Sequence, residues 1–315
     1  KPDYLITETY LDFIINDSVT IVKSRLSMKA NYEGVKVREL ILSGTEMKLV
    51  SVAFDGAALA PADYTLSDTE LTLQPPAKEF SVEIETHIKP QDNKALEGLY
   101  QSGDIFCTQN EPEGFRKITY YLDRSDVMSI YTTRIEADKK SFPVLLSNGN
   151  KTGSGDLDNG RHFAVWHDPF KKPSYLFALV AGDLALRTDT FTTVSGREIA
   201  LEIFVDHGNE DRCQHSLDSL KKAMKWDEDV FGLEYDLDIY MIVAVDAFNM
   251  GAMENKGLNI FNTSCALANT KTATDANFQS IEGIIAHEYF HNWTGNRITC
   301  RDWFQLTLKE GLTVF

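Results

Sequence analysis

The first half of the chain alternates apolar and polar residues. Residues 19–31, 70–76 and 80–90 alternate with a period of two, and turn-forming residues separate these runs. Because a strand with one buried face shows this alternation, the pattern predicts short strands in an antiparallel β-sandwich or saddle-shaped sheet. The polar, glycine-rich run 147–160 is expected to be a loop or hairpin turn.

From about residue 184 the pattern becomes mixed, which predicts an α/β segment. Short apolar runs predict strands, and apolar residues that recur every three or four positions predict helices. The expected strands cover 197–206, 238–245 and 257–262, and the expected helices cover 210–232, 275–295 and 302–315. We therefore predict two domains, an N-terminal β domain over 1–183 and an α/β domain over 184–315.

The ends of these helices carry recognisable signals. Gly232 and Gly295 are expected to stop the first and second helices, and the second is expected to be capped near Asp275. Asp302, followed three residues later by Gln305, gives the third helix a start that resembles a capping box. We expect that third helix to be largely buried, because it carries Leu306, Leu308 and Leu312.

The sequence HEYFH, residues 287–291, places two histidines four positions apart. On a helix these positions share a face, with Cβ atoms about 6 Å apart, so both imidazoles can reach one ion. Zinc binds imidazole nitrogen at about 2.0–2.1 Å, and a catalytic zinc takes three protein ligands and keeps one position open. The same five residues are also compatible with a solvated helix face that binds no metal, so a third ligand has to decide.

Glu310 is the expected third ligand. Eighteen residues separate it from His291, and in that interval one helix ends and another begins, which can return a carboxylate to the histidines. Two histidines and one glutamate form the ligand set of thermolysin-type enzymes. A carboxylate on a buried helix is costly unless it is paired, and either zinc or a salt bridge would pair it. The spacing favours a zinc site made by His287, His291 and Glu310.

A zinc site of this kind predicts hydrolysis of an amide or ester. The ion lowers the pKa of a bound water to about 7 and polarises a carbonyl. Glu288 follows His287 directly, so it flanks the open position and can act as general base. A deaminase with His/Cys/Cys ligands is excluded, because the four cysteines are widely spread and form no C-x-x-C pair.

Residues 251–255 read GAMEN and precede a predicted strand. Together, GAMEN, HEYFH and the spacing to Glu310 resemble the aminopeptidase N family of zinc metallopeptidases, especially its bacterial members. The resemblance covers essentially the whole chain, including 107–127 and 225–246. It implies that residues 184–315 are the first part of a thermolysin-like catalytic domain within a larger enzyme. The tyrosine that supports the transition state in this family is then expected beyond Phe315, and a 1–315 chain alone is expected to be weakly active or inert.

The resemblance also implies a role for each matching residue. The three predicted ligands would hold one Zn²⁺ per chain, and Glu288 would be the catalytic base and acid. Glu254 and Glu111 would bind the free α-amino group of a peptide. The other residues implied to form the substrate pocket are Gln109, Met250, Gly251, Ala252, Met253 and Asn255.

The expected function is therefore a zinc aminopeptidase of broad specificity. Carboxylates at a set distance from the metal would pair with the ammonium of the substrate, so that only the first peptide bond reaches the ion. Two alternatives stay open: a related hydrolase acting on a non-peptide substrate such as an epoxide, and a zinc-stabilised scaffold without turnover. Glu288 argues against the scaffold, because a structural zinc site closes its fourth position and needs no base.

Charge and composition narrow the partners. The formal net charge of −16 disfavours nucleic acid, whose phosphates would be repelled. The chain has no apolar run long enough to cross a membrane and no signal-like start, so we expect a cytoplasmic enzyme, and we expect a monomer. The four cysteines form no C-x-x-C pair and are expected to be reduced.

Overall fold

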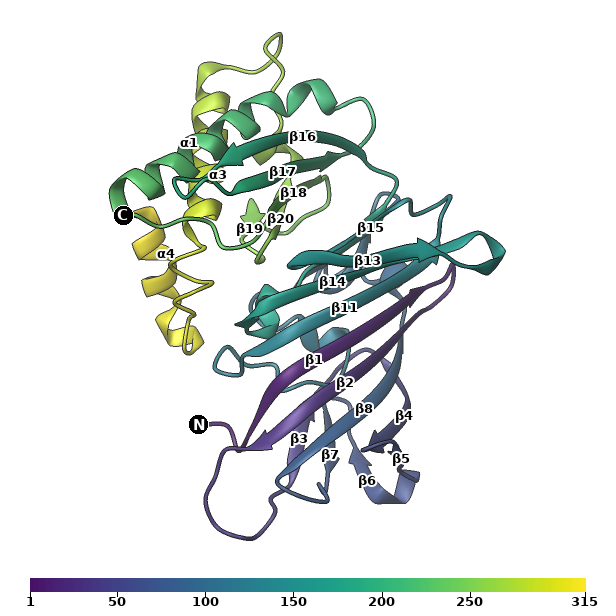
Figure 1. The fold of residues 1–315 in the computed structure, drawn as a ribbon. Helices are drawn as coiled ribbons and strands as arrows, with labels where there is room; N and C mark the ends of the chain where they lie inside the picture. Colours follow the sequence, from purple (N-terminus) through teal and green to yellow (C-terminus); the bar gives the residue numbers. More distant parts are fainter.

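Long strands dominate the first half of the computed structural model, which describes residues 1–315 (Figure 1). Eight of them form one sheet in the order β13-β14-β11-β1-β2-β8-β4-β5. Their bounds are β1 (Tyr4–Ile15), β2 (Thr20–Ala30), β4 (Lys48–Phe54), β5 (Ala57–Ala58), β8 (Glu79–Ile88), β11 (Ser129–Asp138), β13 (Asn150–Asp156) and β14 (Arg161–Lys172). Neighbours are antiparallel, as predicted, except that β1 and β11 are parallel.

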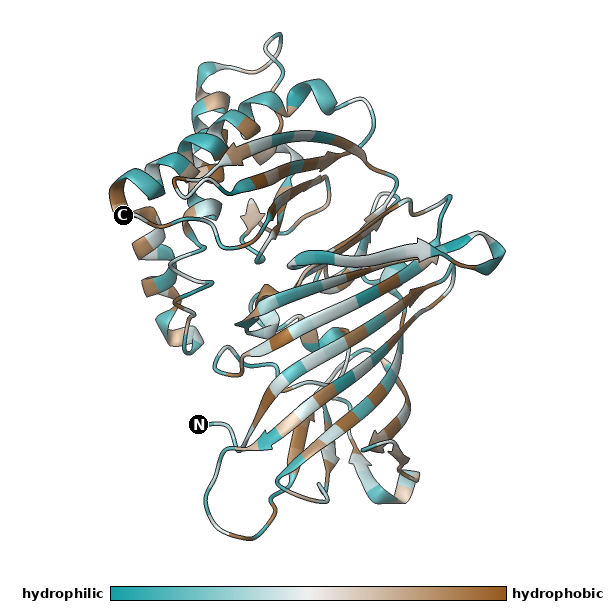
Figure 2. Cartoon of the chain, in the orientation of Figure 1, coloured by the Kyte–Doolittle hydropathy of each residue, from teal (hydrophilic) through white to brown (hydrophobic).

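Two smaller sheets complete this half. One has four strands, β12 (Val144–Ser147), β15 (Leu179–Gly182), β10 (Ile105–Gln109) and β9 (Gly98–Ser102). The other has three strands, β3 (Leu40–Ser43), β7 (Glu70–Leu73) and β6 (Tyr64–Leu66). Alternating hydrophilic and hydrophobic bands run along the long strands (Figure 2), and one apolar core joins the three sheets. The predicted β-rich N-terminal half is confirmed.

The second half contains a five-stranded mixed sheet in the order β16-β17-β18-β20-β19. The strands are β16 (Ala185–Thr192), β17 (Glu198–Val205), β18 (Ile239–Val245), β19 (Ala252–Met253) and β20 (Leu258–Asn262). The three central strands are parallel, and the edge strands β16 and β19 are antiparallel to their neighbours. This arrangement confirms the predicted α/β character.

The second half also contains four helices. They are α1 (Gln214–Phe231), α2 (Thr263–Ala266), α3 (Asp275–Phe290) and α4 (Leu306–Val314), of which α1 and α3 lie together in Figure 1. Leu217 and Leu220 of α1 and Ile281 and Ile285 of α3 share a core with one face of the sheet. Short 3-10 turns occur at η1 (Pro61–Asp63), η2 (Pro90–Asp92), η3 (Phe115–Lys117), η4 (Asp158–Gly160), η5 (Ser174–Leu176), η6 (Glu210–Arg212) and η7 (Trp303–Gln305).

The opposite face of the same sheet packs on the N-terminal half. Met241 and Val243 of β18 and Leu258 and Ile260 of β20 belong to the core that joins the three N-terminal sheets. The predicted domain boundary at 183/184 stays a prediction, because the two halves are continuous through this core. No helix combines the length and the apolar character that a membrane crossing requires.

The second predicted helix is shorter than expected. It begins after Thr274, whose side chain accepts from the amide of Asn277, and it ends at Phe290 instead of continuing to Gly295. The cause is local: the Tyr289 carbonyl accepts both the backbone N–H and the side-chain Nδ2 of Asn292, at 3.0 and 2.6 Å. A side chain that binds a nearby carbonyl in this way competes with the next helical turn. Gly232, by contrast, ends α1 in the left-handed conformation, with φ of 66°.

The burial predicted for the third helix was wrong. The side chain of Asp302 caps the amide of Phe304, but Gln305 returns no capping-box bond, and a 3-10 turn precedes α4. Leu308 and Leu312 are 59% and 54% exposed, whereas the polar residues Lys309 and Thr313 are buried. The reason is that α4 turns its polar face toward the histidines, so its leucines face outward.

The predicted loop 147–160 was partly wrong as well. Only residues 148–149 and 157–160 of this run lie outside strands, and Asn150–Asp156 form strand β13, which pairs with β14. Strand β13 is a polar edge strand with no buried residue, so it lacks the alternation that marks a strand in the sequence. The cysteines are free, as expected, and all but Cys265 are buried.

The turn that follows α3 is tied to α1 by one buried hydrogen bond, which makes folding stability depend on pH. Trp293 Nε1 donates to Asp227 Oδ2 at 2.5 Å. Burial raises the pKa of Asp227 to about 6, although the Trp293 bond opposes the rise. The pKa of an unfolded Asp is about 3.9, so the folded state binds more protons between pH 4 and 6, and stability falls as the pH rises through this window.

We expect Asp227→Asn, which can still accept from Trp293 but cannot ionise, to remove this dependence. The free energy of unfolding of the variant minus that of the wild type should increase from pH 4 to 6. Above pH 6 this difference should be constant. Denaturant titrations at half-unit pH intervals measure it. A difference that does not change across the window would contradict the assignment.

Candidate metal centre and substrate pocket

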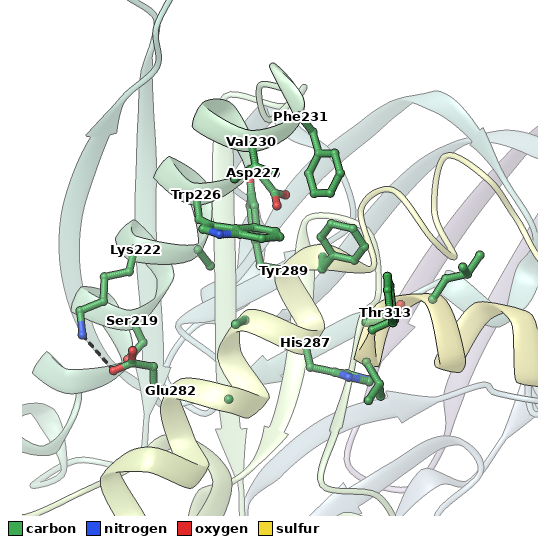
Figure 3. Close-up of a pocket in the computed structure, with 17 residues that line it drawn as sticks. Ser219, Lys222, Trp226, Asp227, Val230, Phe231, Glu282, His287, Tyr289 and Thr313 are labelled. Atoms are coloured by element: carbon green, nitrogen blue, oxygen red, sulfur yellow. Dashed lines mark hydrogen bonds and ion pairs between the residues drawn. The ribbon is translucent and has the colours of Figure 1, made fainter.

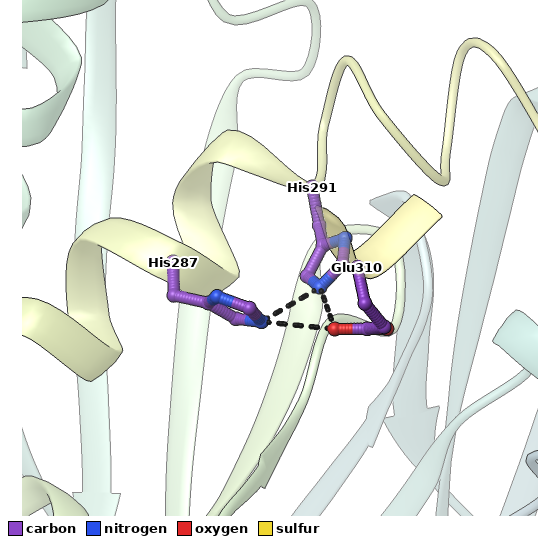
Figure 4. A group of neighbouring side chains, drawn as sticks. All are labelled: His287, His291 and Glu310. Carbon is purple, nitrogen blue, oxygen red and sulfur yellow. Dashed lines mark hydrogen bonds and ion pairs between the residues drawn. The ribbon is translucent and has the colours of Figure 1, made fainter. Parts of the chain in front are cut away.

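The ligand atoms of His287, His291 and Glu310 converge on one point (Figure 4). Nε2 of His287 and Nε2 of His291 lie 3.2 and 3.5 Å from the same Glu310 oxygen, Oε2, and 3.0 Å from each other. Tetrahedral ligands at 2.0–2.1 Å from a zinc ion are about 3.3 Å apart. The three side chains therefore have the mutual spacing of ligands around one zinc-sized ion.

The second nitrogen of His291 is held by the backbone. Its Nδ1 lies 2.8 Å from the carbonyl oxygen of Thr294, and the Thr313 hydroxyl lies 3.1 Å from the same nitrogen. Because a carbonyl only accepts, the proton of neutral His291 sits on Nδ1, and the lone pair on Nε2 points toward the three-donor cluster. Metal-bound histidines are oriented by partners of this kind.

Glu288 is buried beside the same cluster. Its Oε2 has no hydrogen-bond partner within the protein, although the side chain lines the cavity of the three donors. Burial, together with the charge of Glu254, raises the pKa of Glu288 to about 8. A buried, unpaired carboxyl group with a raised pKa is suited to accept or deliver a proton.

The cavity itself has a volume of about 380 Å³ and gathers most of the predicted residues. Its lining consists of Glu111, Met250, Gly251, Ala252, Glu254, Gly283, Ile284, His287, Glu288, His291 and Glu310. Three predicted pocket residues lie outside this lining. Gln109 donates from Nε2 to Met253 Sδ at 3.7 Å, and Asn255 is buried with neither side-chain polar atom paired. Gly283 and Ile284 of α3 were not predicted.

Lys309 is the main residue that the sequence analysis missed. Its Nζ lies 2.5 Å from Oε1 of Glu111, 2.5 Å from Oε1 of Glu254 and 3.2 Å from Oε1 of Glu310. The side chain is 1% exposed. The sequence does contain a signal for Lys309, because this residue directly precedes the predicted ligand Glu310. However, only the orientation of α4 in the structure shows that the helix face carrying Lys309 and Thr313 is buried.

The charges of the cavity are only partly balanced. Burial and the charge of Glu254 raise the pKa of Glu111 to about 7, against the pull of Lys309. Glu254 is different, because burial is outweighed by the charges of His291 and Lys309, and its pKa is lowered. Burial opposes protonation of His291, yet Glu254 and Glu310 raise its pKa to about 9. The shifts thus favour a charged His291 and a partly protonated Glu111 beside an ionised Glu254.

A larger, apolar groove adjoins the cavity (Figure 3). It has a volume of about 780 Å³, and α1, α3 and α4 contribute its lining. Trp226 and Phe231 of α1 and Leu312 of α4 line it, and His287 lines both the groove and the cavity. Leu312, Val314 and Phe315, the exposed apolar residues near the end of α4, belong to the lining of this groove.

Comparison with known proteins identifies the family. Residues 7–176 match the model of the peptidase M1 N-terminal domain, and residues 215–315 match that of the peptidase family M1 domain. The chain therefore belongs to peptidase family M1, and the resemblance seen in the sequence is confirmed. Membership in this family implies zinc, and the three converging donors fit such an ion.

Similar proteins include three that are named aminopeptidase N. The chain is 57% identical to the one from Haemophilus influenzae and 59% identical to the one from Caulobacter vibrioides, over 100% and 99% of its length. It is 57% identical to the one from Escherichia coli over 100% of its length. The chain spans 36% of the length of each of these relatives.

A solved structure supports the fold. The crystal structure of Legionella pneumophila aminopeptidase A in complex with aspartic acid matches with a TM-score of 0.95 and 37% sequence identity. The match covers 99% of this chain and 37% of that chain. The arrangement of a β-rich N-terminal half and the start of an M1 catalytic domain is thus shared with that protein.

Lys309→Met tests the charge network of the cavity. The variant leaves Glu111 and Glu254 buried without their shared cation, and removing one partner of a buried ion pair costs about 3–5 kcal/mol. We expect the free energy of unfolding at pH 7 to fall by about that amount. Denaturant titration of chelator-treated protein measures it, and adding Glu111→Gln should recover part of the loss.

Lys222→Met is the matched control. Lys222 pairs with Glu282 on the surface, where both side chains are exposed, so the loss should stay within about 1 kcal/mol. Equal losses in the two methionine variants would show that the Lys309 cluster has no special part in stability.

Proposed function

We propose that the chain forms the metal site and the amine-binding site of a zinc-dependent aminopeptidase that removes N-terminal amino acids from peptides with broad specificity. One observation carries the proposal: two carboxylates that already hold an ammonium group lie in the same cavity as a three-donor metal cluster. The similarity to three aminopeptidases N over the whole chain supports it.

His287, His291 and Glu310 would hold one Zn²⁺ per chain. The ion, when bound, would lower the pKa of a water molecule to about 7 and polarise the carbonyl of the scissile bond. Thr294 and Thr313 keep the Nδ1 proton of His291 in place, which leaves Nε2 free as a ligand.

Glu288 acts as the general base and acid. Its unpaired oxygen lines the cavity beside the metal ligands, and burial raises the pKa of its carboxyl group to about 8 in the metal-free site. A neighbouring cation lowers the pKa of a carboxyl group, so in the loaded site Glu288 can accept a proton from the attacking water. The same group then delivers a proton to the departing amine.

Glu254 and Glu111 bind the α-ammonium group of the peptide. Four carboxyl groups line the cavity, and the ammonium of Lys309 already pairs with Glu111 and Glu254. A bound divalent ion would lower the pKa of the neighbouring carboxyl groups, and the ammonium of a free N-terminus would then pair with the carboxylates that Lys309 shares. Such pairing favours substrates with a free amine, and the anchor places their first peptide bond at the metal.

The other predicted pocket residues would contact the peptide through their backbone or side chains, or would pack against the residues that do. Gly251 and Ala252 lie at edge strand β19, where backbone groups are available to an extended peptide. Met250 is 51% exposed and lines the cavity, so its flexible side chain would adapt to different first residues. Gln109, Met253 and Asn255 support the pocket from behind.

Partners and location follow from the sequence alone and stay predictions. They are peptide substrates with a free N-terminus, no nucleic acid, no membrane, a monomeric state and a cytoplasmic location. The transition-state tyrosine expected beyond Phe315 also stays a prediction. The experiments below therefore use a protein of the full length of the relatives.

Glu288→Gln tests catalysis against a scaffold role. General acid–base catalysis contributes about 10²–10⁴-fold, so we expect kcat to fall by at least 10²-fold while the zinc content stays at one per chain. Hydrolysis of alanyl- and leucyl-p-nitroanilide and elemental analysis measure these quantities. Glu282→Gln, which changes an exposed residue of the same helix, is the control. Zinc without turnover in the wild type would favour the scaffold, and full activity in Glu288→Gln would exclude Glu288 as the base.

Blocked substrates test the amine anchor. Charge-assisted hydrogen bonds are worth about 1.5–3 kcal/mol, so Glu254→Gln should lower kcat/KM for free-amine p-nitroanilides by about 10–100-fold. N-acetylated substrates should be cleaved poorly by both proteins. Equal cleavage of blocked and free substrates by the wild type would point to an endopeptidase.

A further inference from the structure

A second polar cavity, of about 510 Å³, shares no lining residue with the metal site. Both halves of the chain contribute to it. Lys171 and Lys172 are the last two residues of β14, whereas Asp236, Lys256 and Arg297 come from the second half. Whatever binds in this cavity touches both halves at once.

The cavity is strongly basic although the chain is acidic. Four cationic side chains line it, with Asp236 as the single carboxylate, on a chain with a formal charge of −16. Lys256 and Arg297 share Asp236, the latter through Nε at 2.9 Å, and Lys171 makes no ion pair. Asp168 lies 3.1 Å from Lys172 behind the lining. Counting both acids, two positive charges are left without a partner.

Two of these cations are deeply buried. The side chains of Lys172 and Lys256 are 2% and 4% exposed, and Nζ of Lys172 has no hydrogen-bond partner despite its closeness to Asp168. Burial lowers the pKa of both lysines, although Asp168 opposes the shift at Lys172 and Asp236 opposes it at Lys256. Weaker repulsion adds to the lowering, from Lys256 on Lys172 and from Arg297 on Lys256. Buried ammonium groups are costly even when an acid lies beside them, and an anion in the cavity would relieve that cost.

We propose that this cavity is a binding site for a phosphate group, either inorganic phosphate or a phosphate monoester. The arginine fork and the lysine ammonium groups are the usual partners of phosphate oxygens. The charge of a phosphate group at pH 7, about −1.5 to −2, matches the two uncompensated positive charges.

An anion bound in the cavity would also restrict the motion of residues 254–256, the segment that carries Glu254. Lys256 lies two residues beyond Glu254, and its carbonyl accepts from Asn148 of the N-terminal half. Asn296, another lining residue, donates from Nδ2 to the carbonyl of Glu254 at 3.1 Å. The binding itself requires no catalysis, so the proposal stands or falls independently of the aminopeptidase activity.

Thermal unfolding of the full-length protein in inorganic phosphate tests the proposal. The titration is run at constant ionic strength, balanced with chloride, on the protein as isolated and after removal of metal, so that phosphate on zinc is recognised. A parallel titration uses phosphoserine as the monoester, and another uses acetate. We expect a saturable rise in Tm with phosphate in both metal states.

Three variants locate the site. Arg297→Gln should weaken phosphate binding by about 10-fold or more, the loss of one charge-assisted contact. Lys171→Gln, which changes an exposed residue without an ion pair and so preserves the fold, should weaken it as well. Lys36→Gln makes the same charge change at an exposed residue outside the cavity and should leave it unchanged.

The absence of a saturable shift, or equal phosphate affinity in Lys171→Gln and Lys36→Gln, would overturn the proposal. A stronger response to acetate than to phosphate would overturn the phosphate assignment. A preference for phosphoserine over inorganic phosphate would identify the monoester as the form that binds.

Discussion

The repulsion among four carboxylates in one cavity is the constraint on which this structure depends. Glu111, Glu254, Glu288 and Glu310 all line the cavity, and their repulsion must be relieved by cations or by protonation. Lys309 supplies one positive charge directly, and the two histidines add a place for a metal. The site is thus prepared for positive charge before any ligand arrives.

The fold brings these groups together from distant parts of the chain. Glu111 follows β10 in the N-terminal half, Glu254 follows edge strand β19, and Lys309 lies on α4. The sheet of the second half packs one face on the N-terminal core and the other on α1 and α3. Because these packed faces leave little freedom between the halves, the ion pair of Lys309 with Glu111 joins elements that are already held in register.

A second set of buried charges follows the same principle with the opposite sign. Lys172, Lys256 and Arg297 gather at a cavity between the halves, and Asp168 and Asp236 balance them only in part. An acidic protein thus separates its buried charges into an anionic cavity and a cationic one. Asn296 links the two, since it lines the basic cavity and donates to the carbonyl of Glu254.

The sequence by itself predicted the candidate metal ligands and Glu288, and it located six of the strand segments and the stop at Gly232, because these depend on spacing within a few turns or strands of the chain. Only the tertiary structure decided that Lys309 pairs with Glu111 and Glu254, that α4 exposes Leu308 and Leu312, and that Gln109 is buried outside the cavity lining. The physical reason is that periodicity shows which residues share a face, whereas the neighbours that meet this face come from elsewhere in the chain.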